Sequence, residues 1–367
     1  MSVTARLRSP ARAARGAARR LNNLRDRLFA ADTLVQSGQT PFEVIHTQDI
    51  IQLRCYTPTA TPVHAVPVVL VAPLAVNMTI YDLFPERSLV RDLLARGCKV
   101  YLIDWGRPDA AHDHWRLKTY ITEFMPALLA QVRAHAGTRT LSLHGWSFGG
   151  LFAYGYTAWS GDADIRNLVL LGAPCDYHDN GAIGRQHQRL SRVIRGLGKV
   201  RALRPHATPP RLWRAPGWFN SALYKLTAPA ASLRPYLDLL TELHDREKVA
   251  AHATHAAFLD DMVAYPGGVI QDTVQYLWAD NVLAAGRLPI PGSDAHLSAI
   301  RANLLLVAGR GDPIVTPTCT RALLKFVASR DVKVEVVPGG HMAIVSGNQA
   351  PTTVWPLVGD WLAARSA

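Results

Sequence analysis

A serine, an aspartate and a histidine occur far apart in this chain of 367 residues. Together these three residue types can carry out acyl transfer. Ser147 lies at the centre of the motif Gly-Trp-Ser-Phe-Gly at 145–149. The alternating apolar residues before this motif predict a strand, and the apolar run after it predicts a helix. In such a unit the glycines permit a tight turn, which exposes the serine hydroxyl at a helix N-terminus. Ser147 is therefore the predicted nucleophile.

Asp312 and His341 complete the chemistry that a serine nucleophile needs. Asp312 follows the predicted strand 302–309, and His341 lies in a glycine-rich loop after the predicted strand 332–337. All three side chains thus lie beyond the carboxyl ends of strands, in the order serine, aspartate, histidine that is typical of α/β hydrolases. We expect His341 to act as the general base toward Ser147, and Asp312 to orient the imidazole.

Further residues are expected near these three. The main-chain amide of Phe148, next to the nucleophile, is predicted to form one half of an oxyanion hole. The other half is expected in the loop after an apolar strand, at Val76 or at its neighbours Ala75 and Asn77. Asp176, which follows another predicted strand, is an alternative to the first carboxylate.

The segments that must position these residues predict an α/β-hydrolase fold, with a mostly parallel sheet covered by helices on both faces. Helical patterns at 82–96 and 117–134 separate apolar runs that are typical of buried strands. The chain between the runs 167–174 and 302–309 is rich in aromatic residues and is expected to form an inserted helical cap. The strands are predicted within 42–56, 67–73, 99–105, 140–146, 167–174, 302–309 and 332–337.

This pattern divides the chain into three parts. Residues 1–35 form a basic N-terminal segment, 36–175 and 300–367 form the α/β core, and 176–299 form the cap. A cap over the carboxyl ends of the strands would exclude water and shape an acyl pocket.

The N-terminal segment concentrates the positive charge of the chain, which has a net charge of +12. Asp26 is the only acidic residue before position 31, and two interpretations stay open: a solvated, poorly ordered tail, or a helix that places Leu21, Leu24 and Leu28 on an anionic lipid or granule surface. No nucleic-acid-binding pattern accompanies this charge. The arginines are Arg6, Arg8, Arg12, Arg15, Arg19, Arg20, Arg25 and Arg27.

Nothing in the sequence predicts a metal or a cofactor. His252 and His255 lie one helical turn apart, but no third ligand accompanies them. The four cysteines are scattered without paired spacing, which indicates a reducing compartment such as the cytoplasm. No apolar run reaches the roughly 20 residues of a membrane-spanning helix.

From about residue 38 to its end, the chain resembles the polyhydroxyalkanoate synthases, especially the class III catalytic subunit. The resemblance implies an α/β-hydrolase core with a cap, 3-hydroxyacyl-CoA as substrate, and a covalent acyl intermediate. It leaves open whether a homodimer or a partner subunit is needed. The segments that carry it are 40–45, 85–94, 101–106 with Pro108 and Asp109, 173–177 and 338–341, and in the cap Tyr276, Asn281, Leu283 and Gly286.

Two residues depart from that family's pattern. The synthases carry cysteine where this chain has Ser147, and they often carry histidine where it has Pro313. We therefore expect acyl transfer through a serine acyl-enzyme that uses 3-hydroxyacyl-CoA or carrier thioesters, with a serine hydrolase, either a thioesterase or a polyester esterase, as the alternative. A third hypothesis is a non-catalytic protein that binds polyester granules. Acyl chain length, the acceptor and the oligomeric state cannot be deduced.

Overall fold

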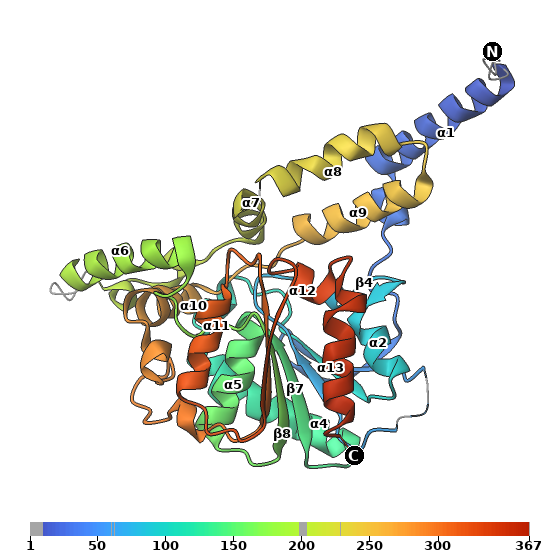
Figure 1. Ribbon diagram of the computed structural model, residues 1–367. Coiled ribbons are helices and arrows are strands. Elements are labelled where there is room, and N and C mark those ends of the chain that lie inside the picture. Colours follow the sequence, from blue (N-terminus) through green and yellow to red (C-terminus); the bar gives the residue numbers. More distant parts are fainter. Residues whose placement is uncertain (1–9, 60, 62, 198–203, 228, 367) are drawn as a thin grey trace, which may run out of the picture.

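An eight-stranded sheet runs through the centre of the computed structural model, which describes residues 10–59, 61, 63–197, 204–227 and 229–366 (Figure 1). The first two strands are antiparallel to their neighbours and all the others are parallel, which confirms the predicted fold class. The order across the sheet is β1 (Phe42–Gln48), β2 (Ile51–Tyr56), β6 (Val100–Asp104), β3 (Val68–Val71), β7 (Leu141–Trp146), β8 (Ile165–Leu171), β9 (Asn303–Gly309) and β10 (Val332–Val337).

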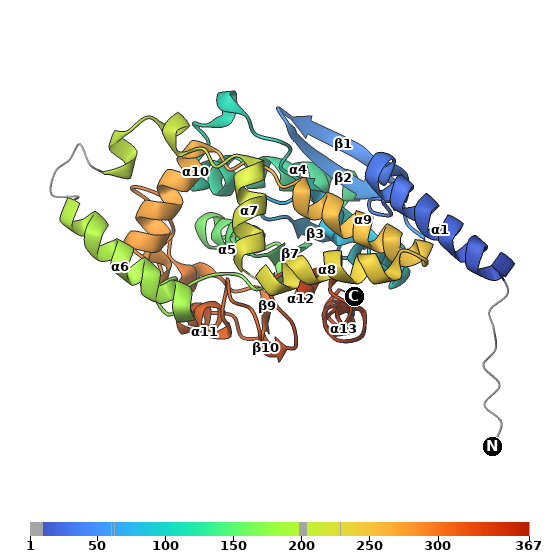
Figure 2. The same ribbon diagram turned by 90° about the horizontal axis from the view of Figure 1, so that it is seen from above.

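Helices cover both faces of this sheet because its inner strands are apolar on both sides. Every residue of β3 is fully buried, as a parallel strand between two helical layers should be. α4 (Met125–Ala136) packs against α5 (Phe148–Ser160), and α2 (Leu89–Ala95) packs against α13 (Val354–Ala363). Figure 2 shows α4 and α5 on one side of the strands and α13 on the other.

One predicted helix boundary is wrong. The first half of the segment 82–96 forms a small antiparallel hairpin of β4 (Asp82–Phe84) and β5 (Arg87–Ser88), and α2 begins only after it. The hydroxyl of Ser88 accepts a hydrogen bond of 3.1 Å from the amide of Arg91. A serine that satisfies an N-terminal amide in this way fixes the start of a helix, so the helical pattern is not extended backward.

A second predicted helix, at 117–134, is present but is not uniform. It consists of α3 (Leu117–Thr119), a π turn (Tyr120–Phe124) and α4. The proline after Met125 lies where the π turn passes into α4, and its missing amide interrupts the regular i to i−4 hydrogen bonds at that point.

The N-terminal segment is not a disordered tail over the part that the structure describes. Pro10–Phe29 form a single helix, α1, that extends away from the sheet (Figure 1). Asn23 is buried and donates to the carbonyl of Leu243 at 2.8 Å, and Arg246 forms an ion pair of 2.8 Å with Asp26. These contacts fasten the C-terminal half of α1 to the insertion described below.

The rest of α1 remains open to solvent. Of the three leucines predicted on one face, Leu24 is half-buried, whereas Leu21 and Leu28 are 67% and 64% exposed. Arg6 and Arg8 lie outside the described residues. Within the described part of the chain, no helix is both long and apolar enough to cross a membrane.

Between β8 and β9 the chain leaves the sheet for a series of helices, and we call residues 176–299 the helical insertion. Figure 1 shows α7, α8 and α9 above the sheet, with α6 and α10 to one side. The helices are α6 (Gly181–Leu197), α7 (Gly217–Thr227), α8 (Pro229–Glu242), α9 (Arg246–Asp260) and α10 (Gly267–Asp272).

Two buried carboxylates fasten the insertion to the core. Asp113 of the core accepts from Arg214 at 2.8 Å and from the amide of Gly267 at 3.1 Å. Asp272 of the insertion accepts from Arg116 of the core at 2.9 Å. Because both carboxylates are buried and paired, removing either partner would leave an uncompensated charge and would loosen this contact.

Candidate active site

The structure brings three of the predicted residues into one chain of hydrogen bonds. His341 Nε2 lies 2.9 Å from Ser147 Oγ, and His341 Nδ1 lies 2.6 Å from Asp312 Oδ2. Asp312 and His341 are 4% and 7% exposed. Low exposure strengthens both hydrogen bonds because little water competes for the same atoms.

Main-chain hydrogen bonds hold Asp312 and His341 in this arrangement. Asp312 Oδ1 accepts from the amides of Ile314 and Val315, each at 2.9 Å, which leaves Oδ2 to face the imidazole. The indole of Trp146 donates to the carbonyl of His341 at 3.0 Å. The residue directly before the nucleophile therefore also positions the histidine.

The turn at Ser147 has the strained geometry that its two flanking glycines predict. Ser147 has φ 55° and ψ −124°, a conformation that a non-glycine residue adopts only when its surroundings enforce it. A Cβ at Gly149 would lie 1.9 Å from the carbonyl oxygen of Val71, and one at Gly145 would lie 2.5 Å from the Cα of Gly150. Larger residues would therefore push the turn away from the sheet.

The loop predicted to supply the second oxyanion amide is held by the insertion. Val76 is half-buried and follows Ala75, whose φ of 68° is left-handed. The amide of Val263 donates to the carbonyl of Ala75 at 3.0 Å. The side chain of Asn77 accepts from the amide of Thr79 at 3.1 Å and thereby caps the short helix η2 (Met78–Tyr81).

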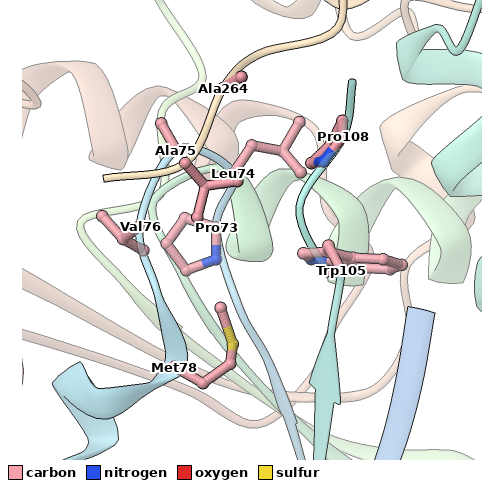
Figure 3. Close-up of a pocket in the computed structure, with 10 residues that line it drawn as sticks. Pro73, Leu74, Ala75, Val76, Met78, Trp105, Pro108 and Ala264 are labelled. Atoms are coloured by element: carbon pink, nitrogen blue, oxygen red, sulfur yellow. The ribbon is translucent and has the colours of Figure 1, made fainter. Parts of the chain in front are cut away.

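This loop borders a hollow that is too small for a substrate. Figure 3 shows Leu74, Ala75 and Val76 grouped with Trp105, Pro108 and Ala264 around it. Its volume is about 10 Å³, roughly the space of one water molecule. The acyl group must therefore enter from another side.

A larger cavity of about 400 Å³ reaches His341 from beneath α7, α8 and α9. Its lining is mostly apolar. Such a lining suits an acyl chain. The insertion contributes Tyr224, Pro235, Tyr236, Phe258 and Leu259, and the core contributes Leu83, Pro313 and Met342.

Two histidines of α9 also line this cavity. Burial lowers the pKa of His255 to about 4, and Arg87 beside it acts in the same direction. Burial lowers the pKa of His252 as well, and its Nδ1 accepts from Arg27 of α1 at 3.3 Å. The two imidazoles therefore stay neutral and contact arginines.

The alternative carboxylate has a structural role. Asp176 accepts from the amides of His178 and Asp179, both at 3.0 Å, and from Asn281 at 2.8 Å. It is not hydrogen-bonded to His341. Asp176 therefore organises the turn after β8.

Sequence reasoning missed the residues of the insertion that hold the loop predicted to bind the oxyanion. Asn77 donates to the carbonyl of Asp261 at 3.1 Å, and Arg107 forms an ion pair with the carboxylate of Asp261. No motif marks the segment from Asp261 to Val263. Only the three-dimensional contact with Ala75 identifies it.

Comparisons with known proteins agree with this architecture. The family model of the alpha/beta hydrolase fold matches residues 77–347, which is well over half of the chain. A second model, the N-terminus of poly-beta-hydroxybutyrate polymerase (PhaC), matches residues 31–93.

Similar curated proteins are polymerase subunits. The chain is 26% identical to the poly(3-hydroxyalkanoate) polymerase subunit PhaC of Haloferax mediterranei over 90% of its own length, and it spans 65% of that relative. It is also 26% identical to the subunit of the same name from Allochromatium vinosum, with 95% of each chain covered.

Solved structures support the fold. A soluble variant of monoglyceride lipase from Saccharomyces cerevisiae matches with a TM-score of 0.57 at 13% identity, covering 90% of this chain and 97% of that one. The monoacylglycerol lipase of Paleococcus ferrophilus matches with a TM-score of 0.51 at 18% identity, covering 84% and 97%. The chain belongs to the alpha/beta hydrolase fold family and, within it, is related to the poly(3-hydroxyalkanoate) polymerases.

Proposed function

We propose that this chain is a synthase-like acyltransferase that takes 3-hydroxyacyl groups from thioesters, such as 3-hydroxyacyl-CoA, onto Ser147. The observation that carries the proposal is the hydrogen-bonded series Ser147, His341, Asp312 beside an apolar cavity of about 400 Å³. Similarity to poly(3-hydroxyalkanoate) polymerase subunits supports the choice of acyl group.

The acyl-enzyme would form by addition to the thioester carbonyl. Ser147 Oγ bonds to the carbonyl carbon while His341 Nε2 takes its proton. Asp312 holds the imidazole in the required tautomer and stabilises the imidazolium. The carbon–sulfur bond then breaks, and His341 returns the proton to the leaving thiolate. A hydroxyl or water attacks the resulting ester in the same way.

The tetrahedral oxyanion would be bound by two main-chain amides, those of Phe148 and Val76. Phe148 is the first residue of α5, and the first amides of a helix have no partner within it. Each donor of this kind contributes about 3 to 4 kcal/mol in other enzymes.

The second candidate is a serine hydrolase, either a 3-hydroxyacyl thioesterase or an esterase that acts on the polyester. Ser147 itself favours it, because an oxygen ester is less activated than the thioester that a cysteine would form. Pro313, which replaces the histidine expected from the synthase resemblance, also lines the cavity.

One incubation separates the two candidates. Purified protein is mixed with 3-hydroxybutyryl-CoA, and both the release of CoA and the size of the product are measured. A synthase releases CoA and forms polymer, whereas a hydrolase releases CoA and free 3-hydroxybutyrate. If the protein neither releases CoA nor hydrolyses the corresponding esters, both candidate functions are contradicted.

A further inference from the structure

Helix α7 buries polar residues and exposes large apolar ones, which is the reverse of an ordinary surface helix. Its buried residues are polar: Asn220 donates to the carbonyl of Val263 at 2.8 Å, and Ser221 donates to that of Leu259 at 2.6 Å. Its large apolar residues face solvent instead, and Trp218, Leu223 and Leu226 are 72%, 52% and 71% exposed. A cluster of large exposed apolar side chains indicates a surface that binds another molecule or a membrane.

The apolar surface continues onto neighbouring helices. On α8, Leu237 and Leu240 are 66% and 67% exposed, and on α1, Leu28 and Phe29 are 64% and 84% exposed. Viewed from above, α7 and α8 lie between α6 at one end of the molecule and α1 at the other (Figure 2). Of the described residues, most of the strongly exposed large apolar side chains belong to these helices.

The part of this surface on α6 is cationic. The described stretches 180–197 and 204–227 contain eight Arg or Lys residues and no Asp or Glu, and two of the eight, Arg214 and Lys225, pair with Asp113 and Asp260 elsewhere in the chain. Along α6, Arg185, Arg189 and Arg192 follow at helical spacing and are all exposed. We call the exposed residues of α1, α6, α7 and α8 the basic apolar face.

We propose that the basic apolar face binds the surface of an anionic phospholipid bilayer. Apolar side chains between arginines match a layer that has negative headgroups outside and acyl chains beneath. An uncharged polymer surface would bind the apolar residues but gains nothing from the arginines. A second copy of this chain would bring the same positive charge against itself.

Binding in this orientation would bring the cavity to the lipid. α8 carries Leu237 and Leu240 on its outer side and Pro235 and Tyr236 in the lining of the cavity that reaches His341. Acyl compounds dissolved in the bilayer would then enter without crossing water. The proposal does not depend on which acyl group is transferred, because it concerns the outer face alone.

Vesicle flotation of the full chain tests the proposal. The protein is mixed with vesicles of phosphatidylcholine alone, or of phosphatidylcholine with roughly one third phosphatidylglycerol, at low and at high salt. We expect flotation with the anionic vesicles only, and weaker binding at high salt because exposed charges are screened. Equal binding to both vesicles, or none to either, would overturn the proposal.

Matched variants locate the face. We expect L223E with L226E, and separately R189E with R192E, each to lower the fraction bound to anionic vesicles at least tenfold. Their controls are V332E and the pair R330E with K333E, at the start of β10, at the opposite end of that strand from the insertion. Controls that reduce binding as much as the first variants would overturn the proposal.

Two further measurements distinguish a loss of lipid binding from misfolding and from self-association. Circular dichroism melting and turnover of a soluble ester show that each variant is folded, since none of its residues lines the cavity. Sedimentation velocity without lipid measures self-association. The unmodified protein could form a dimer that the double variant L223E with L226E does not form, and it could fail to bind vesicles. Together these two results would mean that a second copy covers the face, and they would refute the lipid proposal.

Discussion

The amide of Val263, in the helical insertion, donates a hydrogen bond of 3.0 Å to the carbonyl of Ala75, in the loop that follows β3. Ala75 has a left-handed φ of 68°, and the side chain of the nearby Asn77 donates to the carbonyl of Asp261 at 3.1 Å. The loop proposed to bind the oxyanion is therefore held by the insertion and not by the sheet alone.

The side chain of Asp261 also holds this loop, because its carboxylate accepts from the side chain of Asn77 at 3.3 Å and pairs with Arg107. We expect D261A to lower kcat for a soluble p-nitrophenyl ester about tenfold with little change in KM, because the loss of these two side-chain contacts loosens the position of Val76. Asp261 and its partner Arg107 are mostly exposed, so the melting temperature should change little. The control is D260A, which removes the neighbouring ion pair with Lys225. Equal kinetics for both variants would contradict this role.

The acid of the site can be identified by comparing two amide substitutions. D312N should lower kcat by about 10³ to 10⁴, since an amide favours the wrong imidazole tautomer. D176N should lower it by no more than a few-fold, because the carboxylate of Asp176 accepts hydrogen bonds from the turn after β8 and from Asn281, away from His341. A large decrease of kcat in D176N with a small decrease in D312N would instead identify Asp176, after β8, as the catalytic carboxylate.

The nucleophile determines how water and hydroxyl compete in the proposed reaction. S147C should shift the product of 3-hydroxybutyryl-CoA from free acid toward oligomer, because a thioester intermediate passes its acyl group to a hydroxyl more readily. S147A should release CoA no faster than the uncatalysed reaction. A product ratio that is the same in S147C and in the unmodified protein would mean that the acceptor is selected elsewhere.

The stability of the chain should fall in mild acid because of a buried histidine. His144 of β7 is fully buried, and burial lowers its pKa from 6.5 to about 4. Between these values the unfolded chain binds more protons than the folded one, so the free energy of unfolding decreases as the pH falls from 6.5 toward 4. The contribution is at most about 3 kcal/mol.

Replacing this histidine tests that effect. Neither ring nitrogen of His144 has a hydrogen-bond partner in another described residue, so H144L should leave the melting temperature at pH 7.5 nearly unchanged. At pH 5 the variant should melt higher than the unmodified protein. Parallel pH curves for the two proteins would show that His144 does not titrate between the folded and unfolded states.

The strands and the turn at the nucleophile could be predicted because their signals are local. β10 has the predicted bounds of Val332–Val337, and the close contacts of Gly145 and Gly149 explain why the motif at 145–149 requires glycine. The hairpin at 82–88 could not be predicted, since its boundary with α2 depends on how Ser88 caps that helix.

The insertion was the least predictable part because its residues make their hydrogen bonds with residues that are distant in the sequence. Asn220 and Ser221 are polar yet buried, since carbonyls of Val263 and Leu259 accept their hydrogen bonds. A pattern of apolar residues alone would place α7 with its apolar face inward. The contact between Val263 and Ala75 likewise has no signal in either segment.

Ser147, activated by His341, is proposed to form a covalent acyl-enzyme. Intact-protein and peptide mass spectrometry after brief exposure of the unmodified protein to 3-hydroxyacyl-CoA, stopped with acid, measures this directly. We predict a mass increase equal to one 3-hydroxyacyl group, located on the peptide that contains Ser147 and absent from S147A and H341A. An adduct on another residue, or an adduct that persists in S147A, would contradict it.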